Sequence, residues 1–281
     1  MKPLAQGACP VLVFDSGVGG LSIVQAIRRA WPSLPMDYAF DNAAFPYGNK
    51  PEDWLVDRVE AVITSLLDKT GAGLVVIACN TASTLALPRL RERLRVPVVG
   101  VVPAIKPAAQ VSQTRSIALL ATAGTVTRPY VDQLMQDFAA DCRLYRFASA
   151  PLVDLAEQAL AGHPPAPETL RHILAPIEAQ SDIDTIILGC THFPLLKTAL
   201  QAVAERTYHW VDSGAAVARR VGDLLGVDDV SGNRAAAGVA WTTAPVQQIH
   251  LMEALATLGF ASCRQLTALD FNEGDIVLSS V

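Results

Sequence analysis

The chain has 281 residues, of which 51% are hydrophobic and 17% are charged. This composition excludes an intrinsically disordered protein and suits one large domain or two domains of ordinary size. The formal net charge of −5 argues against a nucleic-acid partner. We expect the one basic cluster to be a solvated helix surface: Arg89, Arg91, Arg93 and Arg95.

Targeting and cofactor signals are scarce. The first ten residues hold one lysine and no apolar segment, which predicts no signal peptide, and no apolar stretch is long enough to span a membrane. The sequence contains no clear dinucleotide motif and no lysine in a setting typical of a Schiff base, so we expect no cofactor. The cysteines form no C-x-x-C pair, which predicts reduced thiols in the cytoplasm and neither a zinc site nor disulfides: Cys9, Cys79, Cys142, Cys190 and Cys263.

Strand-like apolar runs alternate with helical patterns along the chain, which predicts an α/β fold with parallel strands. In the first half we expect strands at 11–14, 74–78 and 96–102, and helices at 21–30, 53–70 and 84–94. Pro88 is expected near the start of the third helix or at a kink in it. Residues 102–107 then look like a segment that crosses to the second half.

The second half repeats this pattern with little residue identity. We expect strands at 116–120, 185–188 and 208–211, and helices at 152–160, 168–179 and 215–225. The repeat predicts two similar lobes, each a mainly parallel sheet flanked by helices, with the active site in the cleft between them.

Cys79 and Cys190 end two similar β-branched runs, and each is followed by small polar residues. Ligands bind at such strand ends in open α/β sheets, and a helix N-terminus there favours a thiolate or a bound carboxylate. The two thiols are 190 − 79 = 111 residues apart, which indicates a pair facing one substrate from opposite sides. That arrangement suits moving a proton off one face of a carbon and onto the other. The other three cysteines are expected to be small buried hydrophobic residues.

A glycine-rich turn follows the first strand, from Asp15 to Gly20. It lacks the G-x-G-x-x-G spacing of a nucleotide site, so we expect its glycines to let the backbone approach a small ligand. Asp15 is suited to hold an ammonium group. Ser16 fits both a carboxylate donor and a helix cap.

Other polar residues near the thiols also have two interpretations. Asn80, Thr81 and Thr191 fit helix caps, but they also fit donors that fix a carboxylate. His192 is suited to tune Cys190 or to relay a proton. Asp212 and Ser213 are expected mainly as an N-cap, because a helical pattern follows them.

These residues lie in motifs that resemble the glutamate racemases of the aspartate/glutamate racemase family. The motifs run in family order from Val11 to about Ala215 and together are highly specific. They are FDSGVGGLS at 14–22, FPYGNK at 45–50, ACNTAS at 78–83, VVPA at 101–104, residues 121–126 and GCTHFPLL at 189–196.

The resemblance implies cofactor-independent racemisation of glutamate, which supplies the D-isomer for peptidoglycan. Cys79 is expected to take the proton from the D-isomer and Cys190 from the L-isomer. The substrate contacts implied are Asp15, Ser16, Tyr47, Gly48, Asn80, Thr81, Thr191 and His192, with Glu157 as a helper carboxylate beside His192. The implied lobes are residues 1–101 plus 213–281 and residues 102–212, with no metal.

Three other functions remain open at this point. An aspartate racemase would use the same chemistry, although the FPYGNK segment favours glutamate. A related decarboxylase would need one site thiol, and a non-catalytic amino-acid-binding protein with two lobes would leave the paired thiols unexplained. A homodimer is compatible with the sequence, which does not fix the oligomeric state.

Two segments depart from the resemblance. Residues 241–245 stand where the family usually has a Thr-Ser-Gly-Asp-like turn. Only 14 residues precede Asp15, whereas relatives that respond to a cell-wall precursor carry a longer N-terminal extension, so we expect no such regulation.

Overall fold

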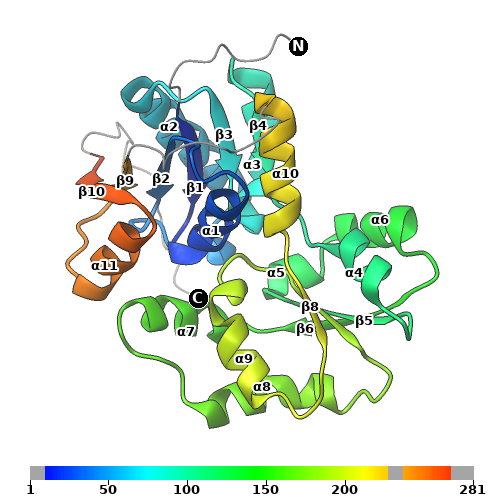
Figure 1. Cartoon of the computed structure of the whole chain (residues 1–281). Coiled ribbons are helices and arrows are strands. Elements are labelled where there is room, and N and C mark those ends of the chain that lie inside the picture. Colours follow the sequence, from blue (N-terminus) through cyan, green and yellow to red (C-terminus); the bar gives the residue numbers. More distant parts are fainter. Residues whose placement is uncertain (1–9, 227–236, 267–281) are drawn as a thin grey trace, which may run out of the picture.

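Two parallel sheets flanked by helices form the protein, with one sheet in each lobe (Figure 1). The computed structural model describes residues 10–226 and 237–266. The predictions for the N-terminal segment, no signal peptide and no regulatory extension, fall largely outside these ranges, as does Cys9. None of the described helices has the length and apolar character needed to cross a membrane.

The first lobe comprises elements from both ends of the described chain. Its strands are β1 (Val11–Asp15), β2 (Met36–Phe40), β3 (Leu74–Ile77), β4 (Val98–Gly100), β9 (Gly238–Thr242) and β10 (Phe260–Gln265). Its helices are η1 (Val18–Gly20), α1 (Leu21–Ala30), η2 (Tyr47–Asn49), α2 (Glu52–Thr70), α3 (Asn80–Arg93), α10 (Gly214–Leu225) and α11 (Ile249–Thr257).

The second lobe is continuous in sequence. Its strands are β5 (Ser116–Ala121), β6 (Arg143–Ala148), β7 (Thr185–Leu188) and β8 (His209–Val211). Its helices are α4 (Ile105–Val111), α5 (Ala123–Val126), α6 (Pro129–Phe138), α7 (Pro151–Leu160), α8 (Pro167–Glu178), η3 (Phe193–Leu196) and α9 (Lys197–Val203). These memberships support the division that we propose, into residues 1–101 plus 213–281 and residues 102–212.

The internal repeat predicted from the sequence is visible in the strand order. The first sheet has the order β10-β9-β2-β1-β3-β4, and the second has β6-β5-β7-β8. The segment β2-β1-β3-β4 therefore corresponds to the whole second sheet, with β3 equivalent to β7. Because Cys79 follows β3 and Cys190 follows β7, the two thiols occupy equivalent places in the two lobes.

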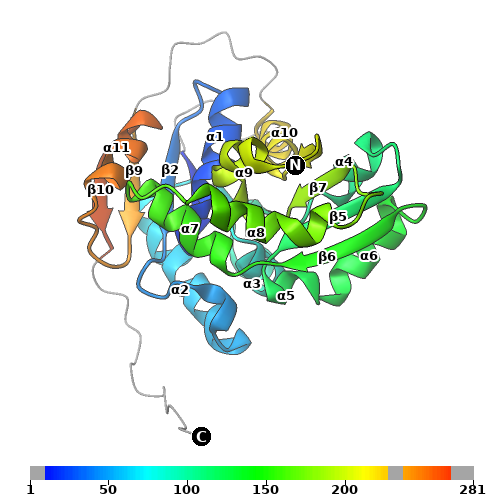
Figure 2. The ribbon, with the colours of Figure 1, turned by 90° about the horizontal axis from the view of Figure 1, so that it is seen from below.

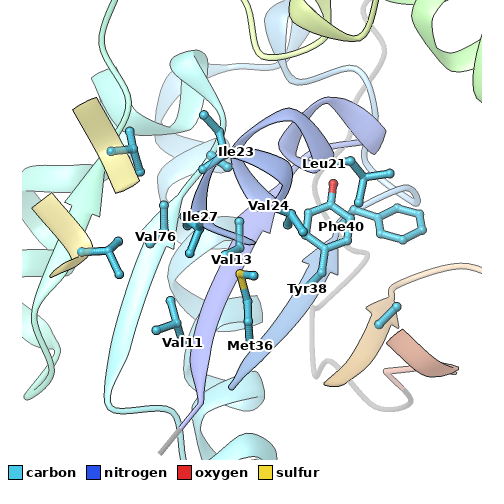
Figure 3. Packing of buried hydrophobic residues seen from close by; sticks show 14 of the residues in the cluster. Val11, Val13, Leu21, Ile23, Val24, Ile27, Met36, Tyr38, Phe40 and Val76 are labelled. Carbon is cyan, nitrogen blue, oxygen red and sulfur yellow. The ribbon is translucent and has the colours of Figure 1, made fainter. Parts of the chain in front are cut away.

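Strand β1 is buried on both faces, which explains its unbroken apolar sequence. Val11 and Val13 pack with α1 and α10 on one face, whereas Leu12 and Phe14 pack with α2 and α3 on the other. Figure 3 shows Val24 of α1 beside this strand and beside Tyr38. These helices hold β1 rigidly, so that its end delivers Asp15 to a fixed position.

The sequence analysis missed several elements. Strand β2 was not predicted because Asp37 interrupts its apolar run; the Asp37 carboxylate is nine-tenths buried and accepts the Val239 backbone N–H at 2.8 Å. Strand β6 was missed because every second or third residue is exposed. Helices α4, α5, α6 and α9 were also missed. Helix α3 begins four residues earlier than predicted, immediately after Cys79, and Pro88 lies inside it.

The C-terminal segment that departs from the family pattern begins at the end of β9, which lies between β10 and β2. Strand β9 pairs with β2 in parallel, and Trp241 lies opposite Ala39. Just beyond β9, the Asn42 side chain accepts the backbone N–H groups of Thr243 and Ala244 at 3.0 and 2.9 Å. The segment is therefore fastened to the turn that follows β2.

Candidate active site

A pocket of about 360 Å³ lies between the two lobes, in the size range of small-molecule sites. All the predicted catalytic and substrate-binding residues line it: Asp15, Ser16, Tyr47, Gly48, Cys79, Asn80, Thr81, Cys190, Thr191 and His192. Glu157 is not among the lining residues, but it contacts His192 from behind. Residues spread over 178 positions, from 15 to 192, therefore meet in one cavity.

Three of the functional side chains stand at or just beyond strand ends. Asp15 ends β1 and is followed by Ser16, Cys79 comes two residues after β3, and Cys190 comes two residues after β7. Both thiols are more than nine-tenths buried. Cys79 is the N-cap residue of α3, whereas Cys190 precedes the short helix η3. The thiols thus face one pocket from the two lobes.

Asp15 is the central acceptor of the site and is fully buried. Its carboxylate accepts the Thr191 hydroxyl at 3.0 Å across the lobes and the Ser16 hydroxyl at 3.1 Å. Burial raises the pKa of Asp15, while the His192 charge and these hydrogen bonds oppose the rise. Ser16 is not a helix cap, so the alternative structural interpretation of this residue is wrong.

The glycines of the turn allow residues of the second lobe to approach its backbone closely, which the sequence did not reveal. A side chain at Gly17 would collide with Glu157 and Phe45, and one at Gly19 would collide with His192 and Thr191. Helix α7, which carries Glu157, lies against η1 and α11 of the first lobe (Figure 2). The glycines therefore let the second lobe close against the first, immediately behind the substrate pocket.

His192 links Cys190 to Glu157. Its Nδ1 lies 3.8 Å from the Cys190 sulfur, and its Nε2 lies 2.8 Å from Glu157 Oε1. The same oxygen accepts the Val18 backbone N–H at 2.9 Å. Burial lowers the pKa of His192, but the hydrogen bonds with Cys190 and Glu157 outweigh burial and raise it to about 10. This rise favours the imidazolium, in which the Nε2–H of His192 donates to Glu157.

Cys79 has a different environment. Its sulfur lies 3.7 Å from the Ser16 hydroxyl. Burial, reinforced by the Asp15 charge, raises the pKa of the Cys79 thiol far above its ordinary value. The two thiols therefore have different surroundings, with burial and Asp15 beside Cys79 and the His192 ring beside Cys190.

Asn80 joins the two cysteine loops. Its Nδ2 donates at 2.7 Å to the carbonyl of Gly189, the residue just before Cys190. Among the described residues its Oδ1 has no hydrogen-bond partner, although the side chain is more than nine-tenths buried. A buried acceptor without a partner at the pocket is suited to receive a donor from a bound molecule.

The predicted helix caps are mostly wrong. Cys79 occupies the N-cap of α3, so Asn80 and Thr81 lie inside its first turn. The N-cap predicted at Asp212 and Ser213 is confirmed in position: Ser213 is the N-cap residue of α10, and Asp212 accepts the Gly214 N–H at 2.9 Å. The Ser213 hydroxyl itself donates to the Val102 carbonyl.

The sequence did not identify four residues at or behind the site: Asp41, Arg58, Arg128 and Glu52. Tyr47 donates its hydroxyl to Asp41 at 2.7 Å, and Arg58 pairs with the same carboxylate. Arg128 lines the pocket and pairs with Glu52 across the lobes at 3.0 Å. Only tertiary contacts reveal these partners, because each pair joins different elements.

The remaining charged and thiol residues lie elsewhere. Cys142 and Cys263 are only partly buried, contrary to the expectation of buried positions, and the four described cysteines are free. The four arginines of the cluster are exposed, as predicted; three lie on α3, and Arg95 follows its end. Arg89 and Arg93 pair with Glu60 of α2. No group of three or more His, Cys, Asp or Glu side chains within the described ranges is placed to hold a metal ion.

Comparison with known proteins gives consistent results. Residues 20–221 match a family model described as Asp/Glu/Hydantoin racemase. A Klebsiella pneumoniae glutamate racemase is 54% identical over 216 residues, 76% of each chain. A Sodalis glossinidius glutamate racemase is 47% identical over 263 residues, 92% of this chain and 90% of the relative.

One solved structure matches along its whole length. It is the Escherichia coli glutamate racemase in complex with L-glutamate and the activator UDP-MurNAc-Ala. The two chains are 44% identical, the TM-score is 0.86, and the match covers 93% of this chain and 100% of the other.

Proposed function

The chain belongs to the Asp/Glu/Hydantoin racemase family, and we propose that it interconverts L- and D-glutamate by proton transfer between two thiols, without a cofactor. One observation carries the mechanism: Cys79 and Cys190 line a single pocket from equivalent strand ends of two lobes. The similar proteins are glutamate racemases, and the match covers most of their length, which supports glutamate over aspartate as the substrate.

In the proposed reaction, one thiol takes a proton from the substrate while the other supplies one. For L-glutamate, the Cys190 thiolate beside the His192 cation takes the α-proton, and the electron pair left on carbon delocalises into the α-carboxylate. The Cys79 thiol then delivers its proton to the other face of the carbon, which yields D-glutamate. Cys190 ends as a thiol and Cys79 as a thiolate, so the enzyme is then set for the D-isomer.

The surrounding groups provide complementary contacts for the amino acid. Asp15 and the unpaired Asn80 Oδ1 are acceptors suited to the ammonium group. Ser16, Thr81 and Thr191 supply hydroxyl groups for carboxylates. We place the distal carboxylate against the wall formed by Tyr47 and Gly48. The Tyr47 hydroxyl does not contact it in this proposal, because that hydroxyl donates to Asp41.

Glu157 and His192 act as a pair in this proposal. Glu157 is held by the Val18 N–H and fixes the ring of His192, which in turn contacts Cys190. The carboxylate stabilises the imidazolium, and the imidazolium stabilises negative charge on the sulfur. Glu157 is thus a positioning residue.

The biological setting follows from the reaction. We place the enzyme in the cytoplasm, with its D-glutamate consumed in peptidoglycan synthesis, and the four free thiols agree with a reducing compartment. A homodimer stays a prediction, which light scattering of the purified protein tests.

The substrate assignment is tested by kcat/KM for glutamate and aspartate on one preparation. Aspartate is one methylene shorter, a difference worth only ~1–3 kcal/mol by itself. A short substrate also leaves buried donors without their carboxylate, and discrimination can then reach ~10⁴-fold. We expect aspartate to be nearly inert. Comparable values would overturn the substrate assignment, and binding without turnover would support a non-catalytic binding protein.

The absence of a cofactor needs its own measurement. Added pyridoxal phosphate or divalent metal should not raise the rate, and a chelator should not lower it. Activity lost on chelation and restored by one metal would refute the cofactor-free mechanism.

A further inference from the structure

A buried carboxylate behind the pocket joins three distant segments. Asp41 is fully buried, and its oxygens accept hydrogen bonds from Tyr47 at 2.7 Å, from Arg58 at 2.8 and 2.9 Å, and from the Thr243 hydroxyl at 2.6 Å. Tyr47 lies in η2, Arg58 lies in α2, and Thr243 follows β9. We call these four residues the Asp41 cluster.

The cluster is connected directly to the pocket. Tyr47 is buried and lines the pocket, and Gly48 and Asn49, which follow it in η2, line it too. The backbone N–H of Asp41 donates to the Asp15 carbonyl at 3.0 Å. The same aspartate thus holds the η2 wall and abuts the strand end that carries Asp15 and Ser16.

The wall depends on this side-chain anchor. Within residues 41–50, the backbone forms local hydrogen bonds from Ala44 to Asp41 and from Lys50 to Tyr47, which define two short turns. Tyr47 also packs against Phe14, with ring centroids 6.5 Å apart. The hydroxyl bond to Asp41 sets the depth and direction of the tyrosine, and therefore the position of the adjoining Gly48 backbone.

The charge on Asp41 is compensated by a buried partner. The Arg58 side chain is 12% exposed and forms a two-pronged pair with the carboxylate. Removing one member of such a pair leaves the other charge buried and unpaired, which is strongly unfavourable. Arg58 thereby holds the Asp41 carboxylate in place as an acceptor for Tyr47 and Thr243.

The C-terminal segment supports the cluster from outside. The Thr243 hydroxyl accepts the Ala43 N–H at 3.0 Å while donating to Asp41. Asn42 receives the N–H groups of Thr243 and Ala244, and its own Nδ2 donates to the Ala244 carbonyl at 3.1 Å. Residues 200 positions apart are thus locked together directly behind the substrate wall.

We propose that Asp41, Arg58 and Thr243 are positioning residues for substrate recognition: they hold the wall from Tyr47 to Asn49, so that the C-terminal segment sets glutamate affinity without touching it. The recognition role of this wall rests on the proposed function. The positioning itself is a property of the fold, so the two can be tested apart.

The test replaces Thr243 by Val, which removes the hydroxyl and keeps the shape. Thr70→Val is the matched control, because the Thr70 hydroxyl bonds the Leu66 carbonyl and the Ala72 N–H at the end of α2, away from the pocket. Thr243→Ser restores a hydroxyl. Steady-state kinetics and hydrogen–deuterium exchange of peptides covering residues 43–50 are measured for all variants and for the wild type.

Thr243→Val removes two hydrogen bonds, the one donated to Asp41 and the one accepted from Ala43, and only part of that loss reaches the pocket. We therefore expect it to raise KM for glutamate about 3- to 10-fold, with kcat within about twofold of the wild type. Exchange at 43–50 should accelerate, and Thr243→Ser should return both values toward the wild type. Thr70→Val should change neither, even where it lowers Tm. Tyr47→Phe breaks the cluster at its other end, so its effect should be non-additive with Thr243→Val.

An unchanged KM in Thr243→Val would overturn the proposal, whether or not exchange at 43–50 changes. Additive effects with Tyr47→Phe would do the same. If Thr243→Val does not fold, the proposal is tested by Tyr47→Phe alone, which must raise both KM and hydrogen exchange at residues 43–50. If the wild type does not racemise glutamate, the proposed function fails, and the exchange measurement still decides whether Thr243 positions the loop.

Discussion

The Sγ atom of Cys190 lies 3.8 Å from Nδ1 of His192, an imidazolium held by Glu157. Cys79 instead contacts the Ser16 hydroxyl at 3.7 Å, and burial beside Asp15 raises the pKa of its thiol. Two equivalent positions of a repeated fold therefore carry opposite charge environments. In the proposed mechanism, this difference suits Cys190 to accept a proton from L-glutamate and Cys79 to donate one.

Replacing either thiol should disable racemisation in both directions. We expect Cys79→Ala and Cys190→Ala each to lower kcat/KM at least ~10²-fold, the low end for losing a positioned acid or base. The two enantiomers have equal free energy, so the loss must be the same from L- and D-glutamate. Chiral chromatography of both reactions measures it.

Cys142→Ala is the control, because Cys142 lies outside the pocket and should leave the rate unchanged. Mixing the two site mutants should not restore activity, because both thiols belong to one chain's cleft. A wild-type rate in either site mutant would end the two-thiol mechanism.

The charge on His192 should appear in the pH profile. Its pKa is raised to about 10, so the imidazolium persists below that pH and is lost as pH rises through it. We expect kcat/KM for L-glutamate to fall through this range. Glu157→Gln removes the anionic partner and should move the fall to lower pH, with about a tenfold loss at pH 9.

Exposed Glu168→Gln, on α8, is the control for charge removal and should keep the wild-type profile. An identical alkaline fall in the wild type and Glu157→Gln would show that Glu157 does not support the imidazolium.

Substitution by alanine should impair the enzyme at Gly19 but leave its thermal stability unchanged at Gly48. Gly19→Ala would drive a methyl group into His192 and Thr191, whereas a Cβ at Gly48 meets no atom within 4 Å. Overpacking costs about 1–3 kcal/mol, so Gly19→Ala should lower kcat/KM ~10- to 100-fold. Gly48→Ala should keep the wild-type Tm, and a bulky residue at Gly48 should raise KM for glutamate while the protein still folds.

Thermal unfolding and kinetics on the four proteins separate the two effects. A wild-type Tm together with wild-type activity in Gly19→Ala would contradict the close approach between the lobes at this glycine.

The sequence predicts the parts of the site that depend on local pattern. Apolar runs that end at Cys79 and Cys190 identify strand ends, and the parallel fold brings such ends together, so both thiols could be placed before the structure was known. The topological repeat was also within reach, because the two halves share this pattern.

Contacts between distant segments could not be predicted from the sequence. Asp41, Arg58 and Thr243 look like ordinary surface residues in sequence, and only the pairing of β9 with β2 brings Thr243 to Asp41. Asp37 hid strand β2, because its buried hydrogen bond to Val239 has no sequence signature. Glu157 was identified through the family resemblance alone, since nothing near it in the chain indicates a partner.

The central claim, that opposed thiols serve opposite faces of one carbon, is tested most directly in heavy water. L-glutamate is incubated with the wild-type protein, and the α-position of each enantiomer is followed by NMR and chiral separation at early times. With two thiols, the D-glutamate formed first should carry deuterium from Cys79, while unreacted L-glutamate keeps its protium. D-glutamate that retains the substrate's own proton would show that a single group carries it from one face to the other, and would contradict the account.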